Sequence, residues 1–231
     1  MGDRRTAVIT GGSRGLGLAL ARELAAREWR LVLDARNAKA LAGAASELRR
    51  ITDVEAVPGD VSDPGHRELL IEAAGHHIDL LVNNASALGP SPQPELRAYP
   101  LSELERVYRV NVLAPLALIQ LALPQMKPGG CVINITSDAA LEPYPGWGGY
   151  GSAKAALEQL TAILAAEQPR LRVYSVDPGD MRTQLHQEAF PGEDISDRPP
   201  PEESVPGLLA LIAGTLPSGR YRSQDVVAAV R

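Results

Sequence analysis

Near the start of the chain stands the stretch Thr10-Gly11-Gly12-Ser13-Arg14-Gly15-Leu16-Gly17. It follows the apolar run 7–10 and leads into the segment 16–27, whose apolar residues have the spacing of a helix. Glycine permits a tight turn and lets the backbone approach a pyrophosphate, whose charge is stabilised by the N-terminus of the following helix. A turn with a purely structural role is the alternative. Because the glycines lie at the first junction of a strand and a helix, we expect a phosphate-binding turn.

The rest of the chain alternates between short apolar runs and longer segments with helical spacing. The runs resemble buried strands and lie at 7–10, 31–33, 54–57, 78–82, 132–135 and 173–176. The helical segments lie at 16–27, 38–50, 67–74, 101–123 and 151–167, and the tail adds a helix at 205–214 and a strand at 219–222. This order predicts an α/β fold with a Rossmann-type, doubly wound parallel sheet of about seven strands and helices on both faces.

Length and composition favour a single domain covering residues 1–231. A chain of 231 residues, 45% of them hydrophobic, suits one α/β domain better than two small ones. The net charge of -5 argues against a nucleic-acid partner, which usually requires a basic face. The single cysteine, Cys131, lies in an apolar run, where a small buried residue is favoured over a nucleophile.

Apolar stretches of the sequence favour neither export nor a membrane span. The first apolar run is too short for a cleavable signal and passes straight into glycines, so we expect a cytoplasmic protein. The longest apolar stretch, 112–123, contains Pro115 and Gln120 and is too short to cross a bilayer. We therefore expect no membrane partner and interpret this stretch as a buried or subunit-packing helix.

Two proline-rich stretches, 89–100 and 191–206, lack the spacing of a regular element and are predicted to be loops. Ligands of such sheets bind beyond the carboxyl ends of the strands, so long loops there are candidate walls of a pocket. We expect the region 184–206 to form a substrate lid. The alternative is a solvent-exposed surface loop with no role in a pocket.

Tyr150 and Lys154 are four residues apart, which is about one helical turn and places both side chains on one face. A free tyrosine has a pKa of about 10, and a nearby ammonium group favours the phenolate. The pair could therefore form an acid for catalysis. Taken alone, the same spacing is more often found on a solvated helix face.

Further motifs occur in one order at compatible spacings, and with them the chain resembles the short-chain dehydrogenase/reductase family. The resemblance is to the single-domain branch whose glycine motif reads T-G-x-x-x-G-x-G, and it covers nearly the whole chain. The motifs after the glycine turn are Asp60-Val61, Asn83-Asn84-Ala85, Asn111, Ser137, Tyr150 with Lys154, Pro178-Gly179 and Thr183. Two positions depart from the family pattern, since Ser86 and Asp177 stand where glycine and asparagine are frequent.

The resemblance implies an enzyme, an NAD(P)-dependent oxidoreductase that interconverts a small carbonyl compound and its alcohol. Ser137 would donate a hydrogen bond to the substrate carbonyl, and Tyr150 would give it a proton as hydride arrives from the nicotinamide. Lys154 would lower the pKa of Tyr150 and bind the nicotinamide ribose, and Asn111 would hold a water that links Lys154 to solvent.

The resemblance also implies a set of cofactor contacts. Asp60 and Val61 would hold the adenine, Asn83 and Ala85 would line the adenosine side, and Thr183 would reach the nicotinamide amide. The full predicted set is Gly11, Ser13, Arg14, Gly15, Leu16, Gly17, Arg36, Asp60, Val61, Asn83, Ala85, Tyr150, Lys154, Pro178, Gly179, Met181 and Thr183.

The end of the second predicted strand favours NADP over NAD. Counted from the glycine turn, the family's acidic position falls on Ala35, while Asp34 comes one residue earlier and should point to the other face. Arg36 follows the key position, and together with Arg14 it could pair with a 2'-phosphate. The alternative is that both arginines are solvated and Asp34 still reaches the ribose of NAD.

The substrate remains a small carbonyl or alcohol of unknown identity. Its expected neighbours are Asp138, Pro143, Tyr144, Trp147, Asp180, Met181 and Leu185. No catalytic metal is expected, because the histidines are scattered. By resemblance we expect a homodimer or homotetramer built on 112–123 and 155–166. The competing functions are a catalytically silent dinucleotide-binding regulatory protein and an epimerase or dehydratase of the family's extended branch.

Overall fold

Seven parallel strands form one sheet, which confirms the predicted fold class. The computed structural model describes residues 4–229. Its strands are β1 (Thr6–Ile9), β2 (Arg30–Ala35), β3 (Val54–Pro58), β4 (Ile78–Asn83), β5 (Met126–Ile135), β6 (Arg172–Asp177) and β7 (Gly219–Arg222). They are arranged in the order β3-β2-β1-β4-β5-β6-β7. The strand order reverses beside β1, so a crevice is expected beyond the carboxyl ends of β1 and β4.

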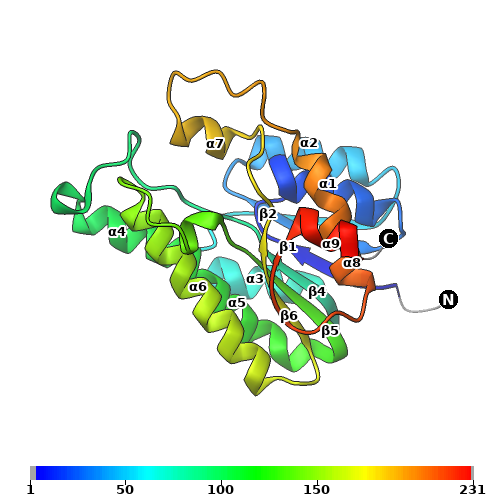
Figure 1. The fold of residues 1–231 in the computed structure, drawn as a ribbon. Coiled ribbons are helices and arrows are strands. Elements are labelled where there is room, and N and C mark those ends of the chain that lie inside the picture. Colours follow the sequence, from blue (N-terminus) through cyan, green and yellow to red (C-terminus); the bar gives the residue numbers. More distant parts are fainter. Residues whose placement is uncertain (1–3, 230–231) are drawn as a thin grey trace.

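Helices cover both faces of this sheet (Figure 1). They are α1 (Gly15–Ala25), α2 (Ala38–Leu48), α3 (Pro64–Ala74), α4 (Leu101–Tyr108), α5 (Ala114–Ala122), α6 (Gly148–Glu167), α7 (Gln184–Ala189), α8 (Val205–Ala213) and α9 (Ser223–Ala229). Successive strand residues point to opposite faces. Ile9 and Leu33 therefore pack in a core with α1, α2, α8 and α9, whereas Val8 and Val32 pack in a second core with α3, α5 and α6.

The long helix predicted at 101–123 contains a change of helix type. A π-helical turn, Arg109–Leu113, lies between α4 and α5, and π-turns inside helices are frequent at functional sites. Among the described residues, Leu101–Gln125 is the one helix long and apolar enough to cross a membrane, by length and composition only. Half of its most apolar window is buried, and Leu118 and Ile119 of α5 belong to the second core.

Three segments differ from the sequence prediction. β5 begins at Met126 rather than at residue 132, because a register shift against β4 lets glycine-containing residues continue the strand. The stretch 191–206, predicted as a loop, contains a short 3-10 turn, Pro201–Ser204, and α7 lies just before it within the region expected to form a lid. α9 was not predicted, because its few residues show too little periodicity. Figure 1 shows α7 and the loop after it projecting at the top of the view.

Candidate active site

A cavity of about 970 Å³ lies at the carboxyl ends of β1 to β6. This volume is at the upper end of the range of roughly 300–1,000 Å³ that small-molecule sites occupy. Most of the predicted site residues line it, from Gly11 in the first turn to Thr183 after β6. Gly17, Asn83 and Asn111 do not line it. The topology thus brings residues from six separate loops to one crevice.

The glycine turn has a backbone that other residues would disfavour. Gly11 and Gly15 have φ angles of 68° and 55°, in the left-handed region. A Cβ at Gly17 would lie 2.5 Å from the carbonyl oxygen of Gly11, so this glycine allows close packing although it lies outside the cavity wall. Leu16 and the rest of α1 follow directly.

The N-terminus of α1 is open to an anion. Its cap residue, Arg14, makes no side-chain cap hydrogen bond, and the first turn contains no acidic residue. Arg14 instead donates to Gln184 of α7 across the cavity. The first N–H groups of a helix have no intrahelical partner and carry partial positive charge. Together with Ser13 and Gly15, which line the cavity, this end of α1 fits a pyrophosphate.

Asp34 lies beneath the glycine turn and is 1% exposed. Its Oδ1 accepts a hydrogen bond of 2.7 Å from the N–H of Gly11, and its Oδ2 lies 3.0 Å from Nε2 of His66. Both carboxylate oxygens therefore have protein partners. A carboxylate held in this way braces the turn.

Arg36, Asp60 and Val61 line the cavity where β2 and β3 end. Arg36 is exposed, lines the cavity and forms no hydrogen bond or ion pair within residues 4–229. Partial burial opposes ionisation of Asp60, but hydrogen bonds from Ser62 and the charge of Arg36 lower its pKa below the usual range. Val61 is 6% exposed. The wall thus offers a guanidinium group, a carboxylate and an apolar side chain to a ligand.

At the end of β4, Asn84 rather than the predicted Asn83 lines the cavity. Asn83 points into the sheet and donates to Asn134 at 2.7 Å. Asn84 donates through Nδ2 to the carbonyl of Thr10, and the N–H of Ala85 donates to Thr10 Oγ1. The structure therefore brings Asn84 and not Asn83 to the cavity, because period-two alternation decides which of the two side chains is buried.

Asn111 lies in the π-helical turn and is 1% exposed. Its Nδ2 donates to the carbonyl of Ala87 at 2.9 Å, and its Oδ1 accepts from the N–H of Ala87 at 2.8 Å and from Ser86 at 3.2 Å. The side chain is therefore occupied in holding the loop after β4. The structure does not bring it to the cavity wall.

Ser137, Tyr150 and Lys154 meet in the cavity from two elements. Ser137 follows β5 and donates through Oγ to Asp138 at 2.9 Å. Tyr150 and Lys154 are buried in the first turns of α6, with 7% and 2% exposure. Lys154 Nζ donates to the carbonyl of Ile135 at 2.8 Å and lies 5.4 Å from the centroid of the Tyr150 ring.

Burial moves the pKa values of this pair in opposite directions. Desolvation raises the pKa of Tyr150 to about 12, although a hydrogen bond with Ser86 opposes the shift. Desolvation lowers the pKa of Lys154 to about 8, and the charge of Glu158 opposes that shift. The direction for Tyr150 is opposite to the lowering expected from the sequence, because desolvation of the phenol raises its pKa and the negative charges of Asp177 and Asp138 raise it further.

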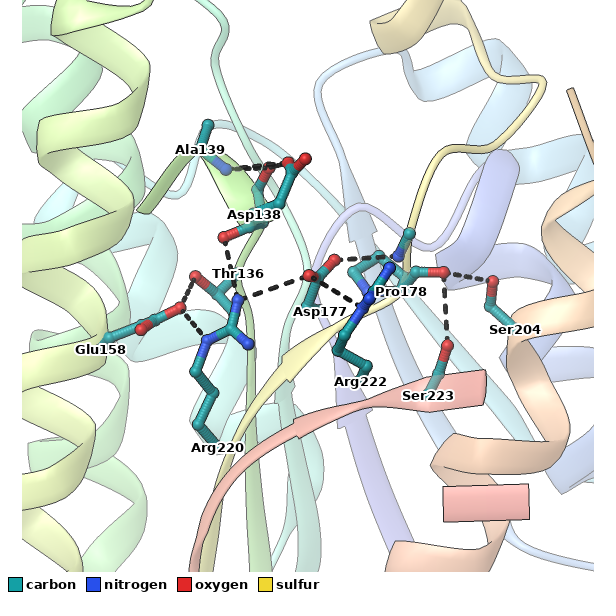
Figure 2. Close-up of polar contacts among 12 residues, drawn as sticks. Thr136, Asp138, Ala139, Glu158, Asp177, Pro178, Ser204, Arg220, Arg222 and Ser223 are labelled. Atoms are coloured by element: carbon teal, nitrogen blue, oxygen red, sulfur yellow. Dashed lines mark hydrogen bonds and ion pairs between the residues drawn. The ribbon is translucent and has the colours of Figure 1, made fainter. Parts of the chain in front are cut away.

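An ion network around Arg220 was not predicted from the sequence (Figure 2). Arg220 of β7 donates to Glu158 Oε1 at 2.9 Å and reaches Asp177 Oδ2 and the carbonyl of Ser137 at 3.4 Å. Glu158 also accepts from Thr136 at 2.7 Å. Arg220 thus links α6, β5 and β6 to β7.

Asp177, where the family pattern favours asparagine, holds the turn that follows β6. Its Oδ1 accepts from the N–H of Gly179 at 2.9 Å, and its Oδ2 also lies 3.9 Å from Arg222. The carbonyl of Pro178 accepts from Ser204 and Ser223, at 2.8 and 3.3 Å (Figure 2). Arg220 and Arg222 therefore compensate the charge that aspartate adds. Pro178 and Gly179 line the cavity, as predicted cofactor contacts should.

Aromatic side chains form the wall beside Tyr150. Trp147 makes a T-shaped contact with Tyr150 and a tilted contact with Phe190, both with ring centroids 5.8 Å apart. His186 lies against Phe190 with centroids 4.9 Å apart. The expected substrate neighbours Asp138, Tyr144, Trp147, Asp180, Met181 and Leu185 all line the cavity. Pro143 does not, and His186 and Phe190 are additional.

Cys131 is fully buried in β5, as predicted, and burial raises the pKa of its thiol to about 12. Such a thiol is neutral and is not a nucleophile at neutral pH. Within residues 4–229, no three His, Cys, Asp or Glu side chains are grouped so that they could hold a metal ion.

Comparison with known proteins gives consistent matches. The family model of the short chain dehydrogenases matches residues 5–194. A rhamnolipids biosynthesis 3-oxoacyl-[acyl-carrier-protein] reductase of Pseudomonas aeruginosa is 31% identical, over 98% of this chain and 87% of the relative. The sepiapterin reductase of Bos taurus is 35% identical, over 80% of this chain and 75% of the relative.

A solved structure adds a cofactor to the comparison. A short chain dehydrogenase from Shigella flexneri, complexed with NADP, superimposes with a TM-score of 0.87 at 26% identity. The match covers 95% of this chain and 97% of that one.

Proposed function

The chain belongs to the short-chain dehydrogenase/reductase family, and on that premise we propose that it is an NADP-dependent enzyme that interconverts a small carbonyl compound and its alcohol. Family membership makes it an NAD(P)-dependent oxidoreductase. The observation that carries the proposal is the burial of Tyr150 and Lys154 beside Ser137 in one cavity, opposite the open N-terminus of α1.

In the direction of reduction, Tyr150 is the proton donor. Its raised pKa keeps the phenol protonated at neutral pH, so it can give a proton to a carbonyl oxygen bound beside it. Ser137 would turn its hydroxyl from Asp138 to the same oxygen and stabilise the developing negative charge. A bound nicotinamide supplies the hydride in reduction and accepts it in oxidation.

Lys154 and Ser86 act on the phenolate that remains after proton transfer. The ammonium of Lys154, 5.4 Å from the ring centroid, favours the anion. Ser86 can turn its hydroxyl from Asn111 Oδ1 and donate a hydrogen bond to the anion. Bulk water then restores the proton. In oxidation, the same phenolate removes the proton from the alcohol.

Three observations support NADP as the cofactor. Arg36 is exposed at the adenosine end of the cavity, where its guanidinium can pair with a 2'-phosphate. Both oxygens of Asp34, which could bind the ribose hydroxyls of NAD, are engaged by Gly11 and His66. A similar structure from Shigella flexneri is complexed with NADP.

Cofactor titration with turnover tests this proposal. We expect NADPH to bind more tightly than NADH and to drive reduction of at least one member of a panel of aldehydes and ketones. Arg36→Ala should weaken NADPH binding about tenfold while changing NADH binding less, because only the 2'-phosphate loses its partner. Arg50→Ala, at an exposed arginine outside the cavity wall, is the matched control.

A clear preference for NADH would overturn the cofactor assignment. Cofactor binding without turnover of any carbonyl or alcohol would instead support the catalytically silent regulatory protein.

We also propose that the chain forms a homodimer or homotetramer through α5 and α6. Leu113, before α5, and Ile163 of α6 are large apolar side chains with 56% and 43% exposure, and contact with a second subunit would bury this apolar surface. The molar mass measured by light scattering tests this proposal, and a monomer at micromolar concentration would contradict it.

A further inference from the structure

His186 of α7 has a ring nitrogen without a partner. Its Nδ1 lies 3.8 Å from the carboxylate of Asp180, whereas its Nε2 is buried and forms no hydrogen bond with residues 4–229. His186 lines the cavity, and its side chain is 11% exposed. A buried polar atom that lacks a partner is costly unless a ligand or water satisfies it. The unpaired Nε2 therefore indicates a contact that the protein alone does not supply.

The wall around this nitrogen is unusually aromatic for this chain. Aromatic residues make up only 4% of the sequence, with one Phe, two Trp and six Tyr. The single Phe, Phe190, and Trp147, Tyr144 and Tyr150 all line the cavity, and His186 lies against Phe190. This concentration offers flat apolar faces beside the proton donor, a setting that suits a planar or cyclic group.

Resting on the proposed function, we propose that this wall is a substrate subsite for an aromatic or cyclic ketone that carries a hydroxyl group. His186 Nε2 is the hydrogen-bond partner of that hydroxyl, and Trp147 and Phe190 contact the ring. The carbonyl of the same molecule lies at Tyr150 and Ser137. The subsite would thus select the substrate at a second polar point, away from the reacting carbon.

A hydroxyl group matches His186 in either protonation state. The carboxylate of Asp180 beside Nδ1 favours a proton on that nitrogen, so a neutral ring presents Nε2 as an acceptor. A protonated ring presents Nε2–H as a donor. Because a hydroxyl both donates and accepts, it pairs with both forms. A methyl ether at the same position can only accept.

The experiment measures kcat/KM with NADPH for acetophenone and for matched pairs of its 3'- and 4'-hydroxy and methoxy derivatives, whose hydroxyl groups cannot bond to their own carbonyl. Hydroxyl and methoxy groups change the reactivity of the ketone similarly, so their ratio isolates the hydrogen bond. In the wild type we expect the kcat/KM of one hydroxy isomer to be about tenfold higher than that of its methoxy partner. One buried hydrogen bond can distinguish two substrates by about this factor. The kcat/KM for acetophenone should also be higher than that for cyclohexyl methyl ketone, because the subsite favours a flat ring.

Two variants test the role of the ring nitrogen. His186→Phe keeps an aromatic ring against Phe190 and removes the polar atoms, so the hydroxy-to-methoxy ratio should fall to near one. His186→Gln returns a polar group and should restore part of the ratio. His76→Phe is the matched control, because His76 is exposed and lies outside the cavity wall. Circular dichroism and melting temperature verify that each variant is folded.

The outcomes separate this inference from the proposed function. A wild-type ratio near one for every pair, or a ratio that His186→Phe leaves unchanged, overturns the subsite. Reduction of aliphatic ketones but of no acetophenone also overturns it while the proposed function stands. Failure to reduce any carbonyl with either nicotinamide refutes both.

Discussion

The two walls of the cavity are built by different means. The wall formed by the loops after β1 and β2 contains the glycine turn, and its buried carboxylate, Asp34, has two protein partners. The wall formed by β5, α6 and β6 contains buried titratable groups, and the pKa values of Tyr150 and Lys154 there lie far from their ordinary values. The first wall depends on the backbone conformation of its glycines, and the second on the burial of ionisable side chains.

The difference separates binding from chemistry. A phosphate-binding turn needs N–H groups in fixed positions, and here the buried charge beneath the turn, Asp34, is fully paired and holds the turn in place. Proton transfer needs a group whose pKa differs from its value in water, and burial that achieves this reduces the stability of the fold. The following substitutions test that division, beginning with the largest expected effect.

Tyr150→Phe should abolish turnover and leave cofactor binding intact. The ring and its contact with Trp147 remain, but the proton donor is lost, so kcat should fall about a thousandfold or more. Steady-state turnover and NADPH titration measure the two effects separately. Substantial residual reduction, or a parallel loss of NADPH affinity, would show that the two walls are not divided in this way.

Gly17→Ala should displace the glycine turn, in the wall formed by the loops after β1 and β2. The new Cβ would lie 2.5 Å from the Gly11 carbonyl oxygen and 2.6 Å from Asn84 Nδ2, so the turn must shift. We expect a loss of about 1–3 kcal/mol in the free energy of unfolding and weaker NADPH binding. Gly43→Ala is the matched control in α2, where a Cβ meets nothing within 4 Å and should stabilise by up to about 1 kcal/mol.

Chemical denaturation and NADPH titration of both glycine variants check this prediction. Equal stability and cofactor affinity in Gly17→Ala and the wild type would mean that the turn tolerates displacement.

The groups that could be predicted best, in both walls, are those that lie close together in the sequence. Gly11 and Gly15 lie in one local motif, and Tyr150 and Lys154 are one helical turn apart, so short spacings place them. Arg220 is 62 residues from Glu158 and 83 from Ser137, and the ion network they form has no local signature. The unpaired nitrogen of His186 likewise depends on how α7 packs. Only the three-dimensional fold places such groups.

Local spacing also fails where burial decides the outcome. Asn83 and Asn84 are adjacent and chemically identical, and only the strand register determines which one lines the cavity. The pKa of Tyr150 is another case, because the sequence shows the nearby lysine but not the depth at which the phenol is buried.

Lys154→Met should make the protein more stable and inactive. Burial lowers the pKa of Lys154 from 10.5 to about 8, which corresponds to a cost of roughly 3 kcal/mol below pH 8. Loss of the hydrogen bond to the Ile135 carbonyl offsets part of the gain, so we expect a net stabilisation of about 1–2 kcal/mol at pH 7.

The pH dependence of this gain has a defined sign. Between pH 8 and 10.5 the unfolded chain binds the Lys154 proton more than the folded protein does, so wild-type stability rises with pH. The advantage of Lys154→Met should therefore be largest below pH 8 and shrink above it. Urea unfolding at pH 7 and pH 9.5 tests this, and an advantage that grows with pH would contradict the assigned shift.

The smallest expected effects are shifts of the pH–activity profile when the ion network is altered. Glu158→Gln and Arg220→Met should shift the profile in opposite directions. Glu158 raises the pKa of Lys154 against the effect of burial, and Arg220 neutralises Glu158. Deprotonation of Lys154 removes the charge that favours the Tyr150 phenolate, so reductase activity should fall as the pH rises past the pKa of Lys154. Glu158→Gln should therefore move this fall to lower pH, and Arg220→Met should move it to higher pH, each by about half a unit. Both variants break the same contact, so a purely structural role would shift both pH profiles in the same direction. The pH dependence of kcat from pH 6 to 10 distinguishes these cases, and shifts of the same sign would exclude electrostatic control of Lys154 by this network.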